Sequence, residues 1–430
     1  KASDEFINNT LGLTKTENSA YIGNLQDYSD IKIFLDLNKM LNKHVAILAK
    51  TGSGKCICPN TEILLGNGQY EKVQDLVNNE LKRGNYLDNK IEISKQKISQ
   101  STFALNKKNN IKKTKINAMM RRKYDDEIIT IKTRSGKILE VTKEHKIPVL
   151  NEFIYWKKAE QLTEKDYLLV PKPKIKGKNQ IIDLLKLWNN SYEVKIKEKE
   201  VLDLIKKNIK VNLKKFSKNF NISYSGFKKW FDCSGIPFSE LKNICNELNL
   251  NFKDIRNKIK YIYVNSKKFS VKINVDEDLS RLLAYLLAEG HNNYKIMSFT
   301  NSSLEIQEDF KFLFKKIFNI TPIKTKENEY RVNNTFLSKT FQKLGFTNSS
   351  WTKYIPQEII TSKTNIITNF LEAFIDCDGY LSKKVPALEI NLASKKLIKS
   401  LNYLFLRLGI VSIKRNKKIK NKIYPKITVY

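Results

Sequence analysis

The sequence predicts a multidomain protein of mixed α and β structure: a β-rich N-terminal region, a helical insert, and an α+β region made of two similar halves. Three observations predict it. The chain has 430 residues, enough for about three domains of roughly 150 residues each. Its formal net charge of +34 divides into +1 for residues 1–55 and +33 for the rest. A short acidic segment also occurs twice in the second half of the chain.

The composition excludes several classes of protein. With 41% hydrophobic residues and only 15 glycines, the chain is neither disordered nor collagen-like. No apolar run in the sequence approaches the ~18 residues of a membrane span, so we expect no membrane partner and a cytoplasmic protein. Five cysteines without a CxxC pair argue against a disulfide framework or a structural zinc site.

The basic charge favours a nucleic-acid partner. Lysine makes up 69 of the 78 basic residues, a bias that an AT-rich genome can also produce. The uneven distribution is more informative, because a balanced segment joined to a cationic one indicates two polypeptides of different purpose. The cationic part should prefer a polyanion.

A phosphate-binding loop is interrupted at residue 55. Residues 44–48 read as a buried strand that leads into a glycine-rich loop, followed by Cys56 where a Ser or Thr should hold Mg²⁺. A chance turn is the alternative. Residues 22–55 resemble the entry to the ATPase core of HerA-type DNA-translocating ATPases, which implies ATP and Mg²⁺ binding in the host protein. The predicted nucleotide-binding residues are Gly52, Ser53, Gly54 and Lys55.

Three ordered blocks follow, within residues 56–63, 136–149 and 156–167. The first block holds a Cys followed by a short turn and a strand. The second holds a Gly followed by Thr-x-x-His, and the third runs from Trp156 to Tyr167. Together they resemble an intein, a self-splicing insert. The resemblance implies an all-β Hint splicing fold over residues 56–180, with residues 1–55 as the N-terminal flank that belongs to the host.

The residue types fit the first step of splicing. Cys56 supplies a thiol nucleophile for the acyl shift from its own amide nitrogen. His145 is suited to protonate that nitrogen, and Thr142 to hydrogen-bond the strained peptide and support the oxyanion. A core imidazole and a buried thiol are the structural alternatives. Cys58 is predicted to be structural.

The insertion point supports the same interpretation. Excision would join Lys55 to the Ser or Thr that the phosphate loop lacks, and that hydroxyl would also be the downstream nucleophile. An intein should end in His-Asn before this residue, whereas the sequence ends at Tyr430. We therefore expect a C-terminally truncated intein that does not splice by itself.

Residues 181–265 are predicted to be a helical insert. Two segments, 212–216 and 221–230, read as helix, tight turn and helix, with Ser223 as the N-cap. They resemble a helix-turn-helix module whose second helix enters the major groove of double-stranded DNA. A small helical bundle with a solvated lysine face is the alternative. The exposed face of the second helix would carry Tyr224, Lys228 and Lys229.

Residues 282–290 and 371–379 are two copies of one pattern: an apolar helix, a carboxylate (Glu289 or Asp378) and a glycine. We interpret the glycine as a helix stop. Small residues four positions apart let two such helices approach closely, which brings the carboxylates together. Adjacent carboxylates suit Mg²⁺ and phosphodiester hydrolysis. In each copy a strand and a helix follow.

This pattern resembles the LAGLIDADG homing endonucleases, over residues 270–430. The resemblance implies an α+β fold with pseudo-two-fold symmetry, a monomer that cleaves double-stranded DNA, and Mg²⁺ held by Glu289 and Asp378. Glu replaces the family's Asp in the first copy. Lys353 matches the lysine before the second copy and would balance charge or position water, although it is one lysine among 69.

Two other functions remain open from the sequence. The first is a P-loop ATPase whose basic remainder is native to it. The second is a non-catalytic DNA-binding regulator built on a decayed endonuclease fold.

Overall fold

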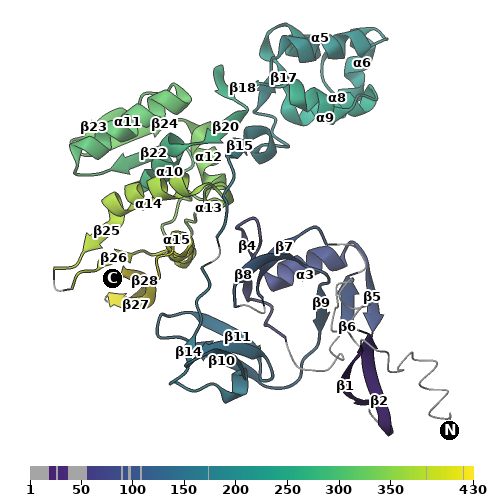
Figure 1. Ribbon diagram of the computed structural model, residues 1–430. Coiled ribbons are helices and arrows are strands. Elements are labelled where there is room, and N and C mark those ends of the chain that lie inside the picture. Colours follow the sequence, from purple (N-terminus) through teal and green to yellow (C-terminus); the bar gives the residue numbers. More distant parts are fainter. Residues whose placement is uncertain are drawn as a thin grey trace. The chain divides into compact units, whose positions relative to one another are not determined.

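The computed structural model divides into two compact units, Lys1–Gly54 and Lys55–Tyr430 (Figure 1). In the first unit, the antiparallel strands β1 (Ser19–Leu25) and β2 (Tyr28–Asp36) are described. The structure describes residues 19–25, 28–36, 56–88, 91–94, 98–106, 109–172, 174–383, 385–419 and 421–430. No helix in these ranges is long and apolar enough to cross a membrane.

The region from Cys56 to Leu168 consists mainly of short antiparallel strands, as a Hint-like region should. Its sheets pair β3 with β4, β5 with β6 and β9, β7 with β8, β10 with β11, and β12 with β13 and β14. The strands are β3 (Glu62–Leu64), β4 (Tyr70–Lys72), β5 (Asn85–Asp88), β6 (Ile91–Ser94), β7 (Ser101–Leu105), β8 (Ile111–Lys115), β9 (Met120–Arg122), β10 (Ile128–Lys132), β11 (Ile138–Thr142), β12 (Lys146–Leu150), β13 (Ile154–Lys158) and β14 (Tyr167–Leu168).

One helix departs from the all-β prediction for this region. Helix α3 spans Val73–Leu81 and buries Leu76, Val77 and Leu81. These residues have the i, i+1, i+5 spacing of one helix face, and they pack with Leu65 into a small separate core. The helix therefore packs against strands β4, β6 and β9.

The insert begins and ends at a pair of strands. Strand β15 (Gln180–Asp183) pairs with β20 (Lys272–Val275). The elements between them are α4 (Leu184–Leu187), β16 (Lys195–Ile196), α5 (Lys199–Asn208), α6 (Leu213–Ser217), α7 (Tyr224–Lys229), β17 (Ile236–Pro237), α8 (Phe238–Glu247), α9 (Phe252–Lys258), β18 (Tyr261–Val264) and β19 (Lys267–Ser270). The sequence predicted the helices but not the four-stranded sheet β17–β16–β18–β19, because its strands are too short to show an alternating pattern.

Residues 277–429 form two halves of the same design. The sheet orders, β21–β22–β24–β23 and β25–β26–β28–β27, are the same. The first half contains α10 (Glu277–Glu289), β21 (Gly290–Asn292), β22 (Ile296–Thr300), α11 (Leu304–Phe318), β23 (Ile323–Lys326), β24 (Glu329–Asn333) and α12 (Thr335–Lys343). The second contains α13 (Gln357–Ile360), α14 (Thr364–Asp378), β25 (Gly379–Leu381), β26 (Leu388–Asn391), α15 (Lys395–Arg407), β27 (Ile413–Ile419) and β28 (Lys422–Val429).

Helices α10 and α14 pack against each other at the centre of this region (Figure 1). The small residues Ala284 and Ala373 are buried, at 0% and 3% exposure. Close approach of the two backbones at small residues is what the sequence predicted. Each half then extends outward from this helix pair, with β23 and β27 as the outermost strands.

The two glycines after the acidic residues act differently from the prediction. Gly290 has φ −76° and Gly379 has φ −80°, so neither takes the left-handed conformation of a glycine helix stop. Both begin a strand directly. A Cβ at Gly290 would lie 2.5 Å from the carbonyl oxygen of Leu286, and one at Gly379 would lie 2.4 Å from that of Ile375. Glycine is needed because the strand starts against the last turn of the helix.

Candidate functional site

The acidic residues of the two halves lie at equivalent positions. Glu289 is the last residue of α10 and Asp378 is the last residue of α14. Burial raises the pKa of both carboxyl groups, that of Asp378 to about 6. The charge of Asp378 raises the pKa of Glu289 further. The two groups are therefore close enough to interact, in surroundings where a nearby cation would favour the charged forms of both.

Asn301 holds the first carboxylate. Its side-chain nitrogen donates to Glu289 Oε2 at 2.5 Å and lies 3.8 Å from Cys377 Sγ. The asparagine is fixed in turn, because its side-chain oxygen accepts from the backbone N–H of Ser303 and Gln307 donates to its carbonyl. The equivalent position of the second half, two residues before the N-cap Ser394, is Leu392. Sequence reasoning missed Asn301, although its place two residues before the Ser303 N-cap was a usable signal.

Lys353 caps the end of helix α10. Its ammonium donates to the carbonyl oxygens of Leu286 (3.3 Å), Leu287 (2.9 Å) and Gly290 (2.9 Å). Burial lowers the pKa of Lys353 to about 8, and the charge of Asp378 opposes that shift. The structure thus brings Lys353 to the acidic pair. All three ammonium hydrogens have a carbonyl acceptor here, so the residue supplies charge and fixes the helix end.

The acidic pair fits a magnesium ion. In the described part of the chain, no group of three or more His, Cys, Asp or Glu side chains could hold a metal by itself. Mg²⁺ commonly uses one or two carboxylates together with waters and substrate phosphate oxygens. Glu289 and Asp378, whose pKa values burial raises, are a donor set of this kind.

Each sheet has one face on the core and one polar face. Phe299 of β22 is fully buried and stacks on Phe310 of α11, with ring centroids 4.5 Å apart. Because side chains alternate along a strand, Ser298 and its partner Arg331 face away from that helix. In the second sheet Ile390 and Ile427 are buried and form a pair. The opposite face carries Glu389, Asn391, Arg415, Lys426 and Thr428.

At the N-terminal site the structure brings Thr142 to Cys56. The amide nitrogen of Cys56 donates to Thr142 Oγ1 at 3.0 Å, and the Thr142 amide donates to the Cys56 carbonyl at 3.1 Å. The Thr142 hydroxyl lies 3.4 Å from that same carbonyl. Thr142 is 2% exposed at the end of β11. Its hydroxyl is therefore held against the nitrogen of the Lys55–Cys56 peptide.

His145 and Cys58 lie on either side of this contact. The backbone N–H of His145 donates to the carbonyl of Thr142 at 2.9 Å, so His145 occupies the turn that follows β11. The backbone N–H of Cys58 donates to Glu140 at 3.1 Å, which continues the pairing along β11. Burial raises the pKa of the Cys58 thiol, as do the charges of Glu140 and Cys56. Cys58 is thus poorly suited to act as a second thiolate.

The predicted phosphate loop lies outside the described residues. This applies to all four of its predicted nucleotide-binding residues, Gly52, Ser53, Gly54 and Lys55.

In the segment predicted to be a helix-turn-helix module, two short helices, α6 and α7, are joined by a tight turn. Helix α6 and the short 3₁₀ turn after it end at Asn221, which has a left-handed φ of 52°. Ser223 caps α7 by accepting from Gly226, as predicted. The aromatic rings of Phe216, Phe220 and Phe227 pack between the two helices. The remaining predicted residues, Tyr224, Lys228 and Lys229, are all exposed.

Two family models match the chain. Residues 20–58 match "Helicase HerA, central domain", and residues 365–430 match "LAGLIDADG-like domain". The first match ends within three residues of Cys56, where the sequence predicts the start of the insert. The second match begins at the second residue of helix α14 and contains Asp378.

Similar curated proteins have unrelated names. A glutamine–fructose-6-phosphate aminotransferase of Methanocaldococcus jannaschii is 22% identical over 93% of this chain and 34% of its own length. A component of the A-type ATP synthase of Pyrococcus abyssi is 28% identical over 38% of this chain and 16% of its own. A replication factor C small subunit of Methanocaldococcus jannaschii is 30% identical over 40% of this chain and 9% of its own length. The chain thus spans about a third or less of the length of these relatives.

Two solved structures are also similar. One is the PabCDC21-1 intein, with 24% identity, a TM-score of 0.25, and coverage of 26% of this chain and 71% of the other. The other is I-DmoI in complex with DNA and Mn, with 15% identity and a TM-score of 0.28. The match covers 36% of this chain and 91% of the other.

Proposed function

We propose that this chain is part of an intein with a LAGLIDADG homing-endonuclease domain, inserted in a HerA-domain host segment, which excises itself from the complete host protein and cleaves the uninterrupted host gene. One observation carries the endonuclease part. Glu289 and Asp378 end two helices, α10 and α14, that pack together at the centre of a duplicated fold. The HerA-type host would bind ATP and Mg²⁺ after excision.

The pattern of similarity supports an insert. The aminotransferase relative covers 93% of this chain, yet that match is only 34% of the relative's own length. The ATP synthase and replication factor relatives share smaller parts of the same chain. Proteins with such different names share a segment most simply if the segment is separable from their own functions.

The first splicing step would follow from the contacts of Cys56. The thiolate sulfur attacks the carbonyl carbon of Lys55, the carbon–nitrogen bond breaks, and the released nitrogen takes up a proton. Thr142 Oγ1 already lies 3.0 Å from that nitrogen and holds the peptide in place. His145, in the turn directly after Thr142, supplies the proton. A thioester between Lys55 and Cys56 results.

DNA cleavage would use the acidic pair. Glu289 and Asp378 would hold Mg²⁺, which when bound would activate water and stabilise the leaving oxygen of the phosphodiester. Asn301 fixes the orientation of Glu289. Lys353 keeps a positive charge at the end of α10 and limits the repulsion between the two carboxylates.

The polar faces of the two sheets would read the DNA. They carry Ser298 and Arg331 in the first half, and Arg415 and Lys426 in the second. Strands of this kind fit the major groove, where base edges differ. Helix α7 would add a second contact through Tyr224, Lys228 and Lys229, which are exposed beyond a tight turn.

A cleavage assay tests the endonuclease. The chain is incubated with duplex DNA that carries the host gene joined across the insertion point, with Mg²⁺ or with a chelator. We expect one double-strand cut near the insertion point, only with Mg²⁺. The same DNA still interrupted by the intein gene is the control and should stay intact.

The alternatives give different results in the same experiment. Tight binding of the joined gene without any cut, at all Mg²⁺ concentrations, would favour a non-catalytic regulator. ATP binding by residues 1–430 without DNA cleavage would favour an ATPase with a native basic domain.

A further inference from the structure

The two endonuclease halves differ at one position beside the acidic pair. Asn301 comes directly after β22, and Leu392 comes directly after β26. The amide of Asn301 donates to the carbonyl of Asn328 at 3.0 Å. In the same way, the amide of Leu392 donates to the carbonyl of Pro425 at 3.2 Å. Each acceptor comes one residue before the partner of the last residue of β22 or β26. The backbones are therefore equivalent here, whereas the side chains differ.

The side chain of Asn301 is fixed beside Glu289. Its nitrogen donates to Glu289 Oε2 at 2.5 Å, and its oxygen accepts from the backbone N–H of Ser303 at 2.8 Å. Gln307 donates to the backbone carbonyl of Asn301 at 2.7 Å. Asn301 is 8% exposed and Gln307 is 2% exposed. Both ends of the Asn301 amide thus have partners, so its N–H group points at the carboxylate before a metal or DNA binds.

The second carboxylate has no such donor. Leu392 packs against the main apolar core and has no polar group in its side chain. Within the described ranges of the chain, no group donates a hydrogen bond to the carboxylate of Asp378. Lys353 directs its three ammonium hydrogens at carbonyl oxygens at the end of α10 and the start of β21. No hydrogen bond therefore fixes the orientation of the Asp378 carboxylate in this part of the structure.

A carboxylate held in place binds a cation better than one that can rotate. Groups that hydrogen-bond a metal ligand orient it, and their loss typically costs about ten- to a hundredfold in metal affinity or activity. The benefit is larger for Glu289 than it would be for an aspartate, because glutamate has one more rotatable bond to fix. Donation from Asn301 also favours the charged form of the carboxylate. The first half is thus better prepared to hold a metal ion than the second.

The two halves would meet the two strands of a DNA duplex in equivalent ways. Two-fold symmetry in a protein matches the two-fold symmetry of its duplex site, and here sheets of the same strand order follow α10 and α14. Glu289 and Asp378 would then each lie nearest to the cleaved phosphate of a different strand. We propose that Asn301 makes these two positions unequal, so that the strand next to Glu289 is cut before the strand next to Asp378. This inference rests on the proposed DNA-cleaving function.

Asn301 is a positioning residue in this reaction. In each cut the oxygen of one water forms a bond to phosphorus, the bond from phosphorus to the leaving oxygen breaks, and that oxygen takes up a proton from the water. Asn301 acts on none of these atoms directly. It orients the carboxylate of Glu289, which would hold Mg²⁺ beside the first phosphate. A duplex cut in one strand should therefore accumulate before the second strand is cut.

The two cuts are measured separately. A duplex of the joined host gene carries a different label on each strand, and single-turnover cleavage is followed at saturating Mg²⁺. Asn301→Leu copies the second half. Asn301→Ser keeps an oxygen that can accept from the N–H of Ser303, but its side chain is too short to reach Glu289.

The control is Asn334→Leu. Asn334 is the N-cap of α12, accepts from the backbone N–H of Leu337 at 2.9 Å, and follows the end of β24 that lies away from Thr300. Its loss should destabilise the first half by about 1 kcal/mol, as thermal unfolding can show, without a change beside Glu289. The control thus separates a loss of stability from a loss of positioning.

We expect the unaltered chain to cut one strand about tenfold faster than the other. Both Asn301 variants should slow that first cut about tenfold and leave the rate for the other strand within about twofold, whereas Asn334→Leu should keep the order of the cuts. Equal rates for the two strands in the unaltered chain would overturn this inference alone. So would an equal slowing of both strands in the Asn301 variants. Failure of the unaltered chain to cut either strand would instead overturn the proposed function.

Binding of Mn²⁺ alone gives a second measurement, which does not depend on cleavage. Both Asn301 variants should bind Mn²⁺ about tenfold more weakly than the unaltered chain, as followed by electron paramagnetic resonance without DNA. Asn334→Leu should bind it as the unaltered chain does. Equal Mn²⁺ affinity in the Asn301 variants and the unaltered chain would contradict the inference.

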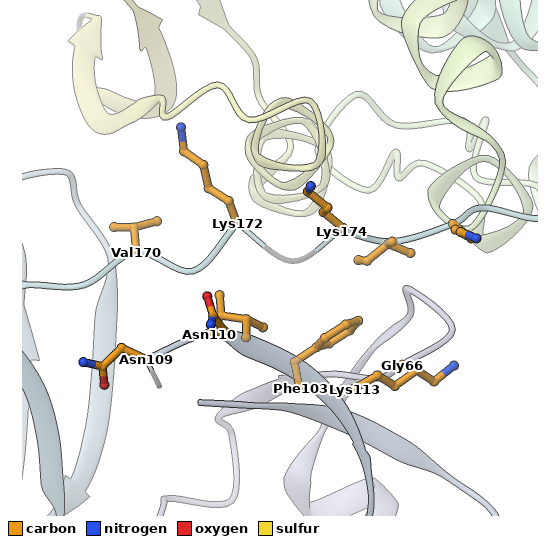
Figure 2. Close-up of a pocket in the computed structure, with 11 residues that line it drawn as sticks. Gly66, Phe103, Asn109, Asn110, Lys113, Val170, Lys172 and Lys174 are labelled. Atoms are coloured by element: carbon orange, nitrogen blue, oxygen red, sulfur yellow. The ribbon is translucent and has the colours of Figure 1, made fainter. Parts of the chain in front are cut away.

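A cavity of about 760 Å³ in the splicing region does not compete for Mn²⁺. It lies between the β7–β8 hairpin and the connecting segment 170–176, and Figure 2 shows Lys172 and Lys174 on this segment. All the charged residues in its wall are lysines, and none of its wall residues is His, Cys, Asp or Glu. The Mn²⁺ measurement therefore does not report on this cavity.

Discussion

Replacing Asp378 by asparagine is expected to reduce the rate of DNA cleavage by about three orders of magnitude, since one of two metal-holding carboxylates is lost. The change is isosteric and removes one negative charge at the end of α14. The measurement is the single-turnover rate of cutting the joined host gene at saturating Mg²⁺. Glu289→Gln should give a loss of similar size, because Glu289 occupies the equivalent position in α10.

Asp376→Asn is the matched control. Asp376 lies two residues earlier on the same helix and is exposed, so its loss should leave the rate within about twofold, as for surface changes away from a site. If Asp378→Asn cleaved as fast as the parent, the acidic pair would not be the catalytic centre.

The same substitution should stabilise the metal-free protein. The folded chain raises the pKa of Asp378 to about 6, chiefly by burial. The charged form therefore destabilises the folded state above that pH, and the penalty disappears as the pH falls toward the unfolded value. At pH 7 we expect Asp378→Asn to raise the free energy of unfolding by on the order of 1–2 kcal/mol. The difference should vanish near pH 4, as thermal unfolding in a chelator can show.

Replacing Thr142 by alanine is expected to slow thioester formation at Cys56 by about a hundredfold, the effect of losing one well-placed hydrogen-bonding group. The hydroxyl lies 3.0 Å from the amide nitrogen of the peptide that must break. The measurement is cleavage between Lys55 and Cys56 by dithiothreitol, made on the product of the complete host gene.

Three further variants complete this experiment. Thr142→Ser keeps the hydroxyl and should keep most of the rate. Cys56→Ala should abolish cleavage. Cys58→Ser should have little effect, because burial raises the pKa of the Cys58 thiol and so disfavours the thiolate nucleophile. An unchanged rate in Thr142→Ala would remove this residue from the mechanism.

The sequence was most informative where a pattern repeats. The two acidic segments predicted a pair of packed helices, each followed by a strand and a helix, and the structure has β22 and α11 after the first and β26 and α15 after the second. Helices α10 and α14 both end at the glycines of these segments, as predicted, but for a different reason, since a left-handed helix stop and the close contact that the structure shows both require glycine. Only the φ of Gly290 and Gly379 distinguishes them.

Contacts between distant segments could not be predicted. Lys353 was one lysine among 69, and its three carbonyl acceptors lie at the end of α10 and the start of β21, more than sixty residues away. Asn301 has no charge, and only its place two residues before Ser303 distinguished it from the many asparagines of the chain. The sheet in the insert was missed because strands such as β16 and β17 have two residues each. The assignment of Cys56, Thr142 and His145 to catalysis stays a prediction.

The mass of the mature host protein tests the whole account most directly. The complete host gene is expressed, and the peptide that spans the insertion point is identified by mass spectrometry after digestion with a protease that does not cut at lysine. A self-removing insert predicts a peptide in which Lys55 is joined to a serine or threonine, with the sequence from Cys56 onward absent. A mature protein in which Lys55 is still followed by Cys56, and no shorter product, would contradict it.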